Sequence, residues 1–209
     1  MPKTSKAPRT RIQKEKSGQI LEAALEVFSN FGFRGSTLDQ IAEAAGLSKP
    51  NLLYYFDSKE AIHARLLEKL LETWLDPLRA MKAEGSAVEE IVSYVRRKLE
   101  MARDYPRESR LFANEILQGA PRIYGQISGP LKQLVDEKSA VMQRWISTGA
   151  IAPTDPHHLI FSIWAMTQHY ADFDVQVQAV LGERADQRFE DALAFLSGLF
   201  RNALSPRAR

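Results

Sequence analysis

The sequence contains no cysteine, no long apolar run and no leader-like N-terminus. Without cysteine, the 209-residue chain has no disulfide framework, no thiolate metal site and no cysteine nucleophile. No stretch approaches the roughly 20 apolar residues that span a bilayer. The basic start MPKTSKAPRTRIQKEK lacks the apolar segment of a signal peptide, so we expect a cytoplasmic protein without a membrane partner.

Motifs of catalysis and metal binding are missing as well. The sequence shows no nucleophile elbow of the type G-x-S-x-G, no H-E-x-x-H pair and no phosphate-binding glycine loop. Its histidines are His63, His157, His158 and His169, and the adjacent pair points to two faces of a helix. We therefore predict no enzyme, no catalytic residues, no metal site and no cofactor.

Apolar residues recur at spacings of three and four along nearly the whole chain, and alternating β-type runs are missing. The predicted fold class is all-α, with a compact head of three short helices and a body that is a bundle of longer helices. We predict three segments: a flexible basic arm over 1–16, the head over 17–60 and the body over 61–209. The arm contains six basic residues and one acidic residue. Such an excess of basic residues is typical of tails that assist nucleic-acid binding, and equally of tails that only increase solubility.

The head has clear helix signals. After a first helix that ends at Gly32, Thr37 and Gln40 form a capping box that begins a second helix, and Gly46 ends it. Ser48 is a suitable N-cap for a third helix over Lys49–Tyr55, with Pro50 tolerated in its first turn.

A second capping box, Asp57 with Glu60, predicts the start of a long fourth helix. In the body, Asp155 and Pro156 predict the start of an apolar helix that runs to about Leu181, and a final helix starts near Arg184. Both of these last two helices have wide apolar stripes, so we expect a homodimer formed through them.

The third helix has the composition of a DNA-reading helix. Lysine suits a phosphate or a guanine edge, asparagine an adenine edge, and tyrosine a phosphate or a thymine methyl group. Leu52 and Leu53 are expected to point inward. The alternative is that the tyrosines are partly core and the rest is solvated surface. The predicted DNA-binding residues are Thr37, Ser48, Lys49, Pro50, Asn51, Tyr54, Tyr55 and Lys59.

The run STLDQIAEAAGLSKPNLLYYFDSKEAI resembles the signature of the tetracycline-repressor (TetR) family of bacterial regulators. This resemblance implies an all-α protein with a helix-turn-helix head and a ligand-binding, dimerising body. Pro50 departs from the glycine or small residue that is frequent there in the family, which bears on the fit to the groove but not on the fold.

The body contains an apolar helix with polar residues in its middle, HLIFSIWAMTQHYADFDVQVQAV. Trp164 and Gln168 are four residues apart and therefore share one face. A buried amide must be paired, so an aromatic wall beside an amide suits a flat ligand with alternating N–H and C=O groups. The alternative is a core tryptophan beside a glutamine that pairs with the backbone.

The phrases DYPRESRLF, LKQLVDEKSA and APTDPHHLIFSIWAMTQHYADFDVQVQAV are similar to the pyrimidine-utilisation branch of this family, whose effector is uracil or a near relative. This resemblance implies that Trp74 and Trp164 wall the pyrimidine and that Gln168 pairs with its amide edge. Further pocket candidates are Asn114, His169 and Asp172. Arg103 and Arg110 are expected to cap or pair at helix ends rather than contact ligand.

We therefore expect a homodimeric repressor of pyrimidine-catabolism genes that binds a palindromic double-stranded DNA operator. Two reading helices would sit about one helical turn, roughly 34 Å, apart, and uracil or thymine would release the protein. The alternatives are a TetR-type repressor that senses another planar or hydrophobic molecule, and a non-sensing DNA-binding accessory protein.

Overall fold

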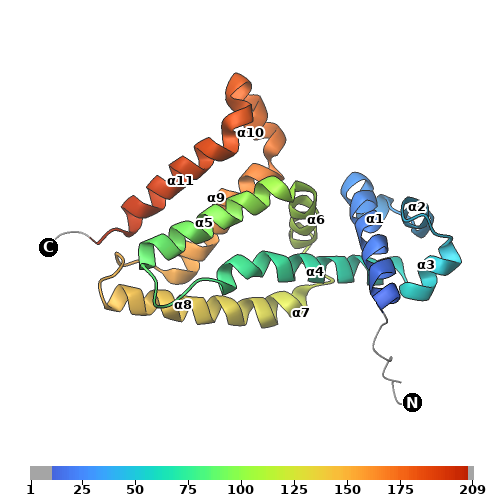
Figure 1. Ribbon diagram of the computed structural model, residues 1–209, viewed down its shortest axis with the longest axis horizontal. Helices are drawn as coiled ribbons and strands as arrows, with labels where there is room; N and C mark the ends of the chain where they lie inside the picture. Colours follow the sequence, from blue (N-terminus) through green and yellow to red (C-terminus); the bar gives the residue numbers. More distant parts are fainter. Residues whose placement is uncertain (1–10, 207–209) are drawn as a thin grey trace, which may run out of the picture. The chain divides into compact units, whose positions relative to one another are not determined.

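The computed structural model describes residues 11–206, and helices are the regular secondary structure throughout this range (Figure 1). This confirms the predicted all-α fold class. The chain divides into two compact units between Lys69 and Leu70. Residues 1–10 of the predicted basic arm lie outside the described range. Residues 11–16 were predicted as part of that arm but form the first turns of a helix, which corrects the prediction.

The first unit consists of α1 (Arg11–Gly35), α2 (Leu38–Ala44), α3 (Lys49–Tyr55) and the beginning of α4 (Lys59–Arg79). Gly32 interrupts α1 at φ +66°, in the left-handed region that favours glycine, close to the predicted helix end. The core of the unit is a set of fully or almost fully buried apolar side chains that includes Ile20, Ala24, Phe28, Ile41, Leu52 and Ile62.

The predicted caps of the reading motif are present. The Thr37 hydroxyl accepts from the Gln40 amide at 3.2 Å, and the Gln40 side chain accepts from the Thr37 amide at 2.8 Å. Gly46 has φ +63°, and the Ser48 hydroxyl accepts from the Asn51 amide at 3.4 Å. These caps fix the ends of α2 and α3, which lack the length to be stable alone.

Two expectations for this unit were wrong. The N-terminal cap of α4 is Ser58, whose hydroxyl accepts from the Ala61 amide at 3.1 Å, and not Asp57. Serine is an equally good N-cap, and α4 begins one residue later than an Asp57 cap requires. Leu53 is 37% exposed, whereas Leu52 is fully buried, because neighbouring helix positions point about 100° apart.

The second unit contains the end of α4 and all later helices. They are α5 (Ala87–Asp104), α6 (Pro106–Leu117), α7 (Tyr124–Gln126), the π-helix η1 (Ile127–Leu131), α8 (Lys132–Ser147), α9 (Pro156–Asp172), α10 (Asp174–Leu181), the 3₁₀ helix η2 (Gly182–Gln187) and α11 (Arg188–Leu204).

Helix α5 is central to this unit. It packs against α9 on one side and α11 on another, and α9 also contacts α6 and α8 (Figure 1). The buried core includes Leu78, Ile91, Val95, Met142, Ile160 and Ile163. A bidentate pair between Glu89 and Arg201, at 2.9–3.0 Å, links α5 to α11 at the surface. This packing sets the positions of the side chains between α4, α5, α6 and α9.

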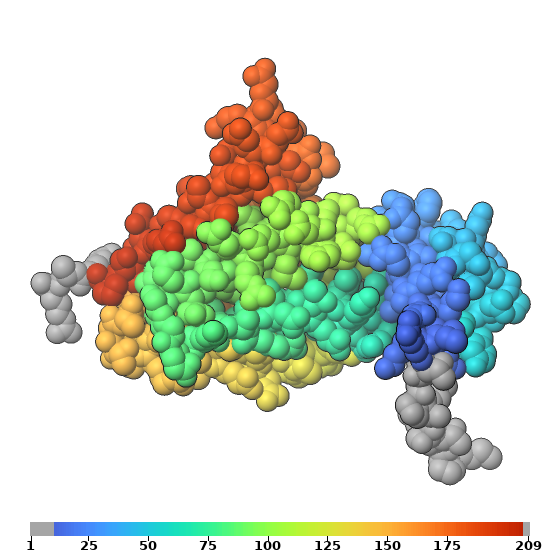
Figure 2. Space-filling view, in the orientation of Figure 1, coloured from blue at the N-terminus to red at the C-terminus, as the bar shows by residue number. Residues whose placement is uncertain are grey.

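The apolar helix predicted to run to Leu181 is broken at Phe173, which has φ −117° and ψ 28° and ends α9. Asp174 then begins α10 and pairs with Arg188 of α11 at 2.8 Å. The final helix begins at Arg188 rather than Arg184, because η2 occupies residues 182–187 and Gly182 has φ +58°. Helix α10 and the start of α11 project from the rest of the unit (Figure 2).

Within residues 11–206, no helix is both long and apolar enough to cross a membrane.

Candidate DNA-reading helix and effector cavity

Helix α3 presents a polar surface beside a buried apolar anchor. Lys49, Pro50 and Asn51 are exposed at its start, and Leu52 is fully buried. The Tyr54 side chain is 71% exposed and meets the half-buried Tyr55 ring edge to face at a centroid distance of 5.2 Å. The outward positions therefore hold the donors and aromatic rings that suit a major-groove contact.

Most of the predicted DNA-binding side chains also make contacts within the first unit. The Lys49 ammonium pairs with Asp39 at 2.9 Å, and the pair is solvent-exposed. The Thr37 hydroxyl belongs to the capping box. The Lys59 ammonium donates to the carbonyl oxygens of Phe33 and Ser36 at 2.7 and 2.6 Å. Lys59 therefore joins the start of α4 to the end of α1, a role that the sequence did not indicate.

The second unit has a cavity of about 590 Å³ between α6, η1 and α9, which we call the outer cavity. This volume lies within the range of small-molecule sites. The lining is mainly apolar, with a few polar side chains. Its residues are Arg110, Phe112, Ala113, Asn114, Ile116, Leu117, Ile127, Leu131, Trp164, Gln168, Asp172 and Phe173.

A smaller space of about 50 Å³, which we call the inner recess, is bounded by helices α4, α5, α6 and α9 and by η1. It shares Phe112, Leu131, Trp164 and Gln168 with the outer cavity, so the two spaces adjoin. Its complete lining is Leu71, Trp74, Leu75, Tyr94, Lys98, Phe112, Leu131, Trp164 and Gln168.

Aromatic side chains fix the walls of the recess. The Trp164 indole N–H donates to the Tyr94 hydroxyl at 2.6 Å, joining α9 to α5. Tyr94 is 2% exposed, and burial raises the pKa of its hydroxyl, so it remains neutral. The Trp74 ring meets Phe112 edge to face at 5.3 Å. Two indoles are thereby held at the boundary of the recess.

The recess also contains charge. Lys98 is only 6% exposed, and its Nζ lies 5.3 Å from the centroid of the Trp74 ring. Burial lowers the pKa of Lys98 to about 8, although the charge of Asp172 acts in the opposite direction. Asp172 accepts a hydrogen bond from Ser109 at 2.5 Å. Burial raises the pKa of its carboxyl group, although the hydrogen bond from Ser109 acts to lower it.

The predicted ligand-binding residues separate by position. Trp164 and Gln168 line both spaces, Trp74 lines the inner recess, and Asn114 and Asp172 line the outer cavity. His169 lines neither space. It is exposed and stacks on Phe173 at 5.1 Å, because its position on α9 faces away from α5 and α6.

Arg110, which was expected to cap or pair at a helix end, lines the outer cavity, and Arg103 pairs with Asp104 as expected. Sequence reasoning also missed Tyr94, Lys98 and Phe112. A signal for Lys98 was present: the helical spacing of Ile91, Val95 and Ala102 predicts an apolar residue at 98.

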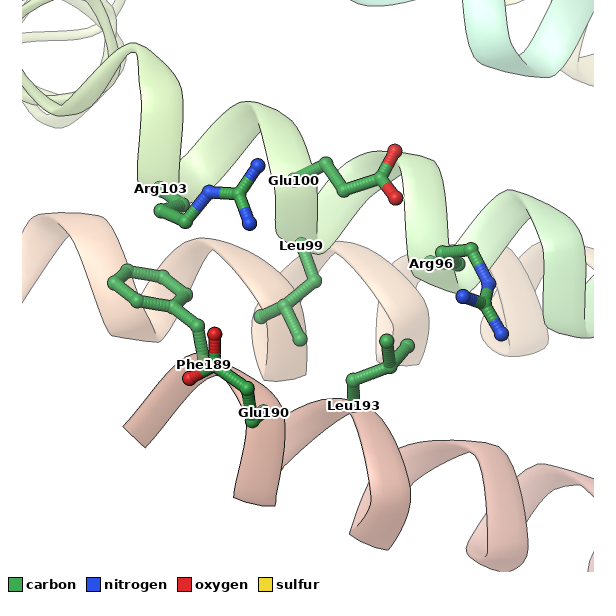
Figure 3. Close-up of a pocket in the computed structure, with 7 residues that line it drawn as sticks. All are labelled: Arg96, Leu99, Glu100, Arg103, Phe189, Glu190 and Leu193. Carbon is green, nitrogen blue, oxygen red and sulfur yellow. The ribbon is translucent and has the colours of Figure 1, made fainter. Parts of the chain in front are cut away.

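A further pocket of about 60 Å³ lies between α5 and α11, where Leu99 of α5 points toward Phe189 and Leu193 of α11 (Figure 3). Its lining also contains Arg96 and Arg103, whose charges are balanced by Glu100 and Glu190. It is too small for a drug-sized ligand and has no net charge. Among the described residues, no group of three or more His, Asp or Glu side chains is arranged to hold a metal ion.

Comparison with known proteins agrees with this architecture. Residues 20–66 match the family described as bacterial regulatory proteins, tetR family, and residues 67–207 match the C-terminal region of YcdC-like proteins. The chain belongs to the TetR family and is a DNA-binding transcriptional regulator with a helix-turn-helix head. It is 53% identical over 174 residues to the HTH-type transcriptional regulator RutR of Escherichia coli, in strain K12 and in O157:H7. That alignment covers 83% of this chain and 82% of the relative.

Solved structures share the fold. The transcriptional regulator SCO4942 from Streptomyces coelicolor superposes with a TM-score of 0.70 at 22% identity, over 92% of this chain and 99% of its own. AibR, solved with isovaleryl coenzyme A and operator DNA, superposes with a TM-score of 0.68 at 19% identity. The superposition covers 88% of this chain and 97% of AibR. These relatives are regulators, which confirms the prediction that the chain is not an enzyme.

Proposed function

We propose that this regulator is a cytoplasmic, homodimeric repressor of pyrimidine-catabolism genes, released from a palindromic operator by uracil or a similar pyrimidine. The observation that carries the effector assignment is the side chain of Gln168 between the inner recess and the outer cavity. The resemblance of the α9 segment to pyrimidine-utilisation regulators supports the same assignment. The proposed ligand contacts are Trp74, Trp164 and Gln168, with Asn114 and Asp172 on the outer side.

Gln168 is suited to an amide-like ligand. Among the described residues, its side chain makes no hydrogen bond, although it is half-buried and lines both spaces. A buried amide without a partner is costly, and a cyclic amide with adjacent N–H and C=O groups satisfies it with two hydrogen bonds. Trp74 and Trp164 supply flat apolar surface for the ring.

The size of the outer cavity favours one alternative. Its volume of about 590 Å³ and its apolar lining also suit a larger hydrophobic effector. A regulator of that kind would bind aromatic or aliphatic acids more tightly than a free pyrimidine. A thermal-shift panel of bases, nucleosides and such acids separates the two assignments.

The dimer is proposed from apolar surface that the second unit leaves uncovered. Phe161 of α9, Val175 and Val180 of α10, and Phe195 and Leu199 of α11 are between 38% and 84% exposed. Helix α10 contacts only α9, η2 and α11 substantially. Such a surface is typical of a self-complementary interface, and two copies would then present two reading helices to a palindromic site.

Coupling is proposed to run through α4, because this helix contains Lys59 in the first unit and Trp74 in the second. A ligand at Trp74 releases DNA only as far as it binds the DNA-free conformation more tightly than the DNA-bound one. The proposed DNA contacts are the exposed side chains of α3, namely Lys49, Asn51 and Tyr54 together with Tyr55, and the start of α3 at Ser48 and Pro50. Thr37 and Lys59 would approach the phosphates.

The test is binding to a labelled DNA fragment from upstream of pyrimidine-catabolism genes, measured by fluorescence anisotropy during a uracil titration. We expect the wild-type protein to dissociate from the DNA fragment as uracil or thymine is added. Gln168→Leu should bind DNA normally and dissociate only at much higher uracil. Binding that is unchanged at saturating uracil and thymine would refute the proposed effector, and a Gln168→Leu variant with a normal response would refute the role of Gln168.

A further inference from the structure

Lys98 occupies a core position on α5. Helical spacing places it in line with Ile91, Val95 and Ala102, which are 0–5% exposed, and Lys98 itself is 6% exposed. Lysine is almost never buried to this extent without a partner. Its side chain lines the inner recess together with Gln168 and the two indoles.

The ammonium group of Lys98 lacks a hydrogen-bond or ion-pair partner in the part of the chain that the structure describes. Among residues 11–206, none accepts a hydrogen bond from it, and no carboxylate lies within the 4.0 Å of an ion pair. Asp172 of α9 is the acid that acts on it electrostatically, but Asp172 is already bonded to Ser109. The other polar groups that line the recess are the neutral hydroxyl of Tyr94 on α5 and the amide of Gln168 on α9, and the α4 and η1 side chains that line it are apolar. Arg110 on α6 and His169 on α9 lie outside the recess and act electrostatically on Asp172.

A buried ammonium without a hydrogen bond is destabilising in an apolar setting, and a methionine or leucine would fill the same position without this penalty. The recess therefore holds a strong donor that the fold does not use. The cation above the Trp74 ring gains from the quadrupole of the indole, but that contact leaves the N–H groups unpaired.

We propose that Lys98 is the specificity-determining residue of the effector site: its ammonium donates to a carbonyl oxygen of a cyclic imide, while Gln168 pairs with the adjoining N–H and C=O groups. This inference rests on the proposed function and deepens it by naming the chemistry of a ligand that lies in the adjoining outer cavity and reaches the recess. A ring that carries more negative charge on its oxygen, as in the anion of an acidic imide, binds more tightly. A ring with an amino group at that position, as in cytosine, places two donors against each other and is rejected.

The test is isothermal titration calorimetry of the full chain with uracil, cytosine, barbiturate and glutarimide. The variants are Lys98→Met, which removes the donor, and Lys98→Gln, which keeps a neutral donor. Arg97→Met is the matched control, because it removes a cation from the neighbouring, exposed position of α5. Thermal melting of each variant verifies that it is folded.

We expect Lys98→Met to weaken uracil and barbiturate binding by about 10- to 100-fold, the effect of losing one hydrogen bond to a charged donor. Lys98→Gln should retain part of the uracil affinity and lose the preference for barbiturate, and Arg97→Met should bind like the wild type. Wild-type affinity for uracil should be constant below about pH 8, where Lys98 is protonated, and decrease above it.

The outcomes separate this inference from the proposed function. If uracil does not bind the wild type but barbiturate or glutarimide binds and needs Lys98, the proposed effector is wrong and the role of Lys98 stands. Unchanged uracil binding in Lys98→Met, or equal binding of cytosine and uracil by the wild type, overturns the role of Lys98. Absence of binding by all three imides overturns it as well.

Discussion

The indole N–H of Trp164 donates to the hydroxyl of Tyr94 across 2.6 Å, from α9 to α5. The two residues are 70 positions apart in the chain, and both line the recess that holds Lys98 and Gln168. This bond fixes the plane of the indole against which we propose the ligand ring lies. Because both groups are withdrawn from solvent, loss of this hydrogen bond is also expected to destabilise the fold.

Replacement of Tyr94 by phenylalanine tests the importance of this bond. The change leaves the indole N–H without its acceptor, which we expect to cost about 1–3 kcal/mol in the free energy of unfolding. Uracil affinity should also decrease, because the indole is no longer held in place. Urea denaturation and calorimetry measure the two effects. Tyr105→Phe, at a residue that is 44% exposed, is the control and should change neither.

Replacement of Lys98 by methionine should stabilise the ligand-free protein. Because the folded-state pKa of Lys98 is about 8 and the ordinary value is 10.5, the unfolded chain binds more protons between these values. The penalty of the buried charge is therefore complete below about pH 8 and disappears as the pH rises towards 10.5. We expect Lys98→Met to be more stable by about 1–3 kcal/mol at pH 7, with a gain that shrinks above pH 8.

Denaturation at pH 7 and pH 9.5 measures this difference. A variant that is less stable than the wild type at pH 7 would mean that the ammonium has a stabilising partner, contrary to the geometry of the recess.

Replacement of Lys49 by alanine should weaken DNA binding without unfolding the head. The exposed pair of Lys49 with Asp39 contributes at most about 1 kcal/mol to stability. A lysine that contacts a phosphate contributes about one counterion to the salt dependence of binding, so the slope of log K against log salt should fall by about 1. Lys132→Ala, which breaks a similar exposed pair with Asp136 on α8, should leave the slope unchanged. Equal salt-dependence slopes for the wild type and Lys49→Ala would show that Lys49 does not contact the DNA.

Replacement of Phe195 by glutamate should dissociate the proposed dimer. Phe195 is 65% exposed on α11, and a charge placed in an apolar self-complementary interface is repeated in both copies. Light scattering after gel filtration should give a dimer for the wild type and a monomer for Phe195→Glu. Tyr124→Glu is the matched control, since Tyr124 is 66% exposed on α7, away from the proposed interface. A Phe195→Glu variant that remains dimeric would locate the interface elsewhere.

Much of the head was predictable because its determinants are local. The capping box of Thr37 and Gln40, the positive φ of Gly46 and the Ser48 cap depend on residues within a few positions of each other, and the bounds of α3 agree with the prediction. The prediction of Asp57 as the N-cap of α4 failed because the adjacent residues Asp57 and Ser58 are both acceptable caps. The structure shows that Ser58 is the cap, since α4 begins at Lys59.

The body was less predictable. The spacing of Trp164 and Gln168 places both on one face of α9, and the structure has both at the same cavity. The break at Phe173 was not visible in the sequence, because no glycine or proline lies between residues 157 and 181 to mark the end of α9. The tertiary structure places the break there, and Asp174 of the next helix pairs with Arg188.

The sequence by itself determined the helical class, the reading motif and the amide–indole pair on α9, because periodicity and caps act over one or two turns. The tertiary structure decided which other helices face that pair. Packing of α5 against α9 brings Tyr94 and Lys98 to Trp164 and Gln168, and it leaves His169 outside. Such a recess depends on the relative placement of distant helices, and this placement follows from the burial of the whole core rather than from any short segment.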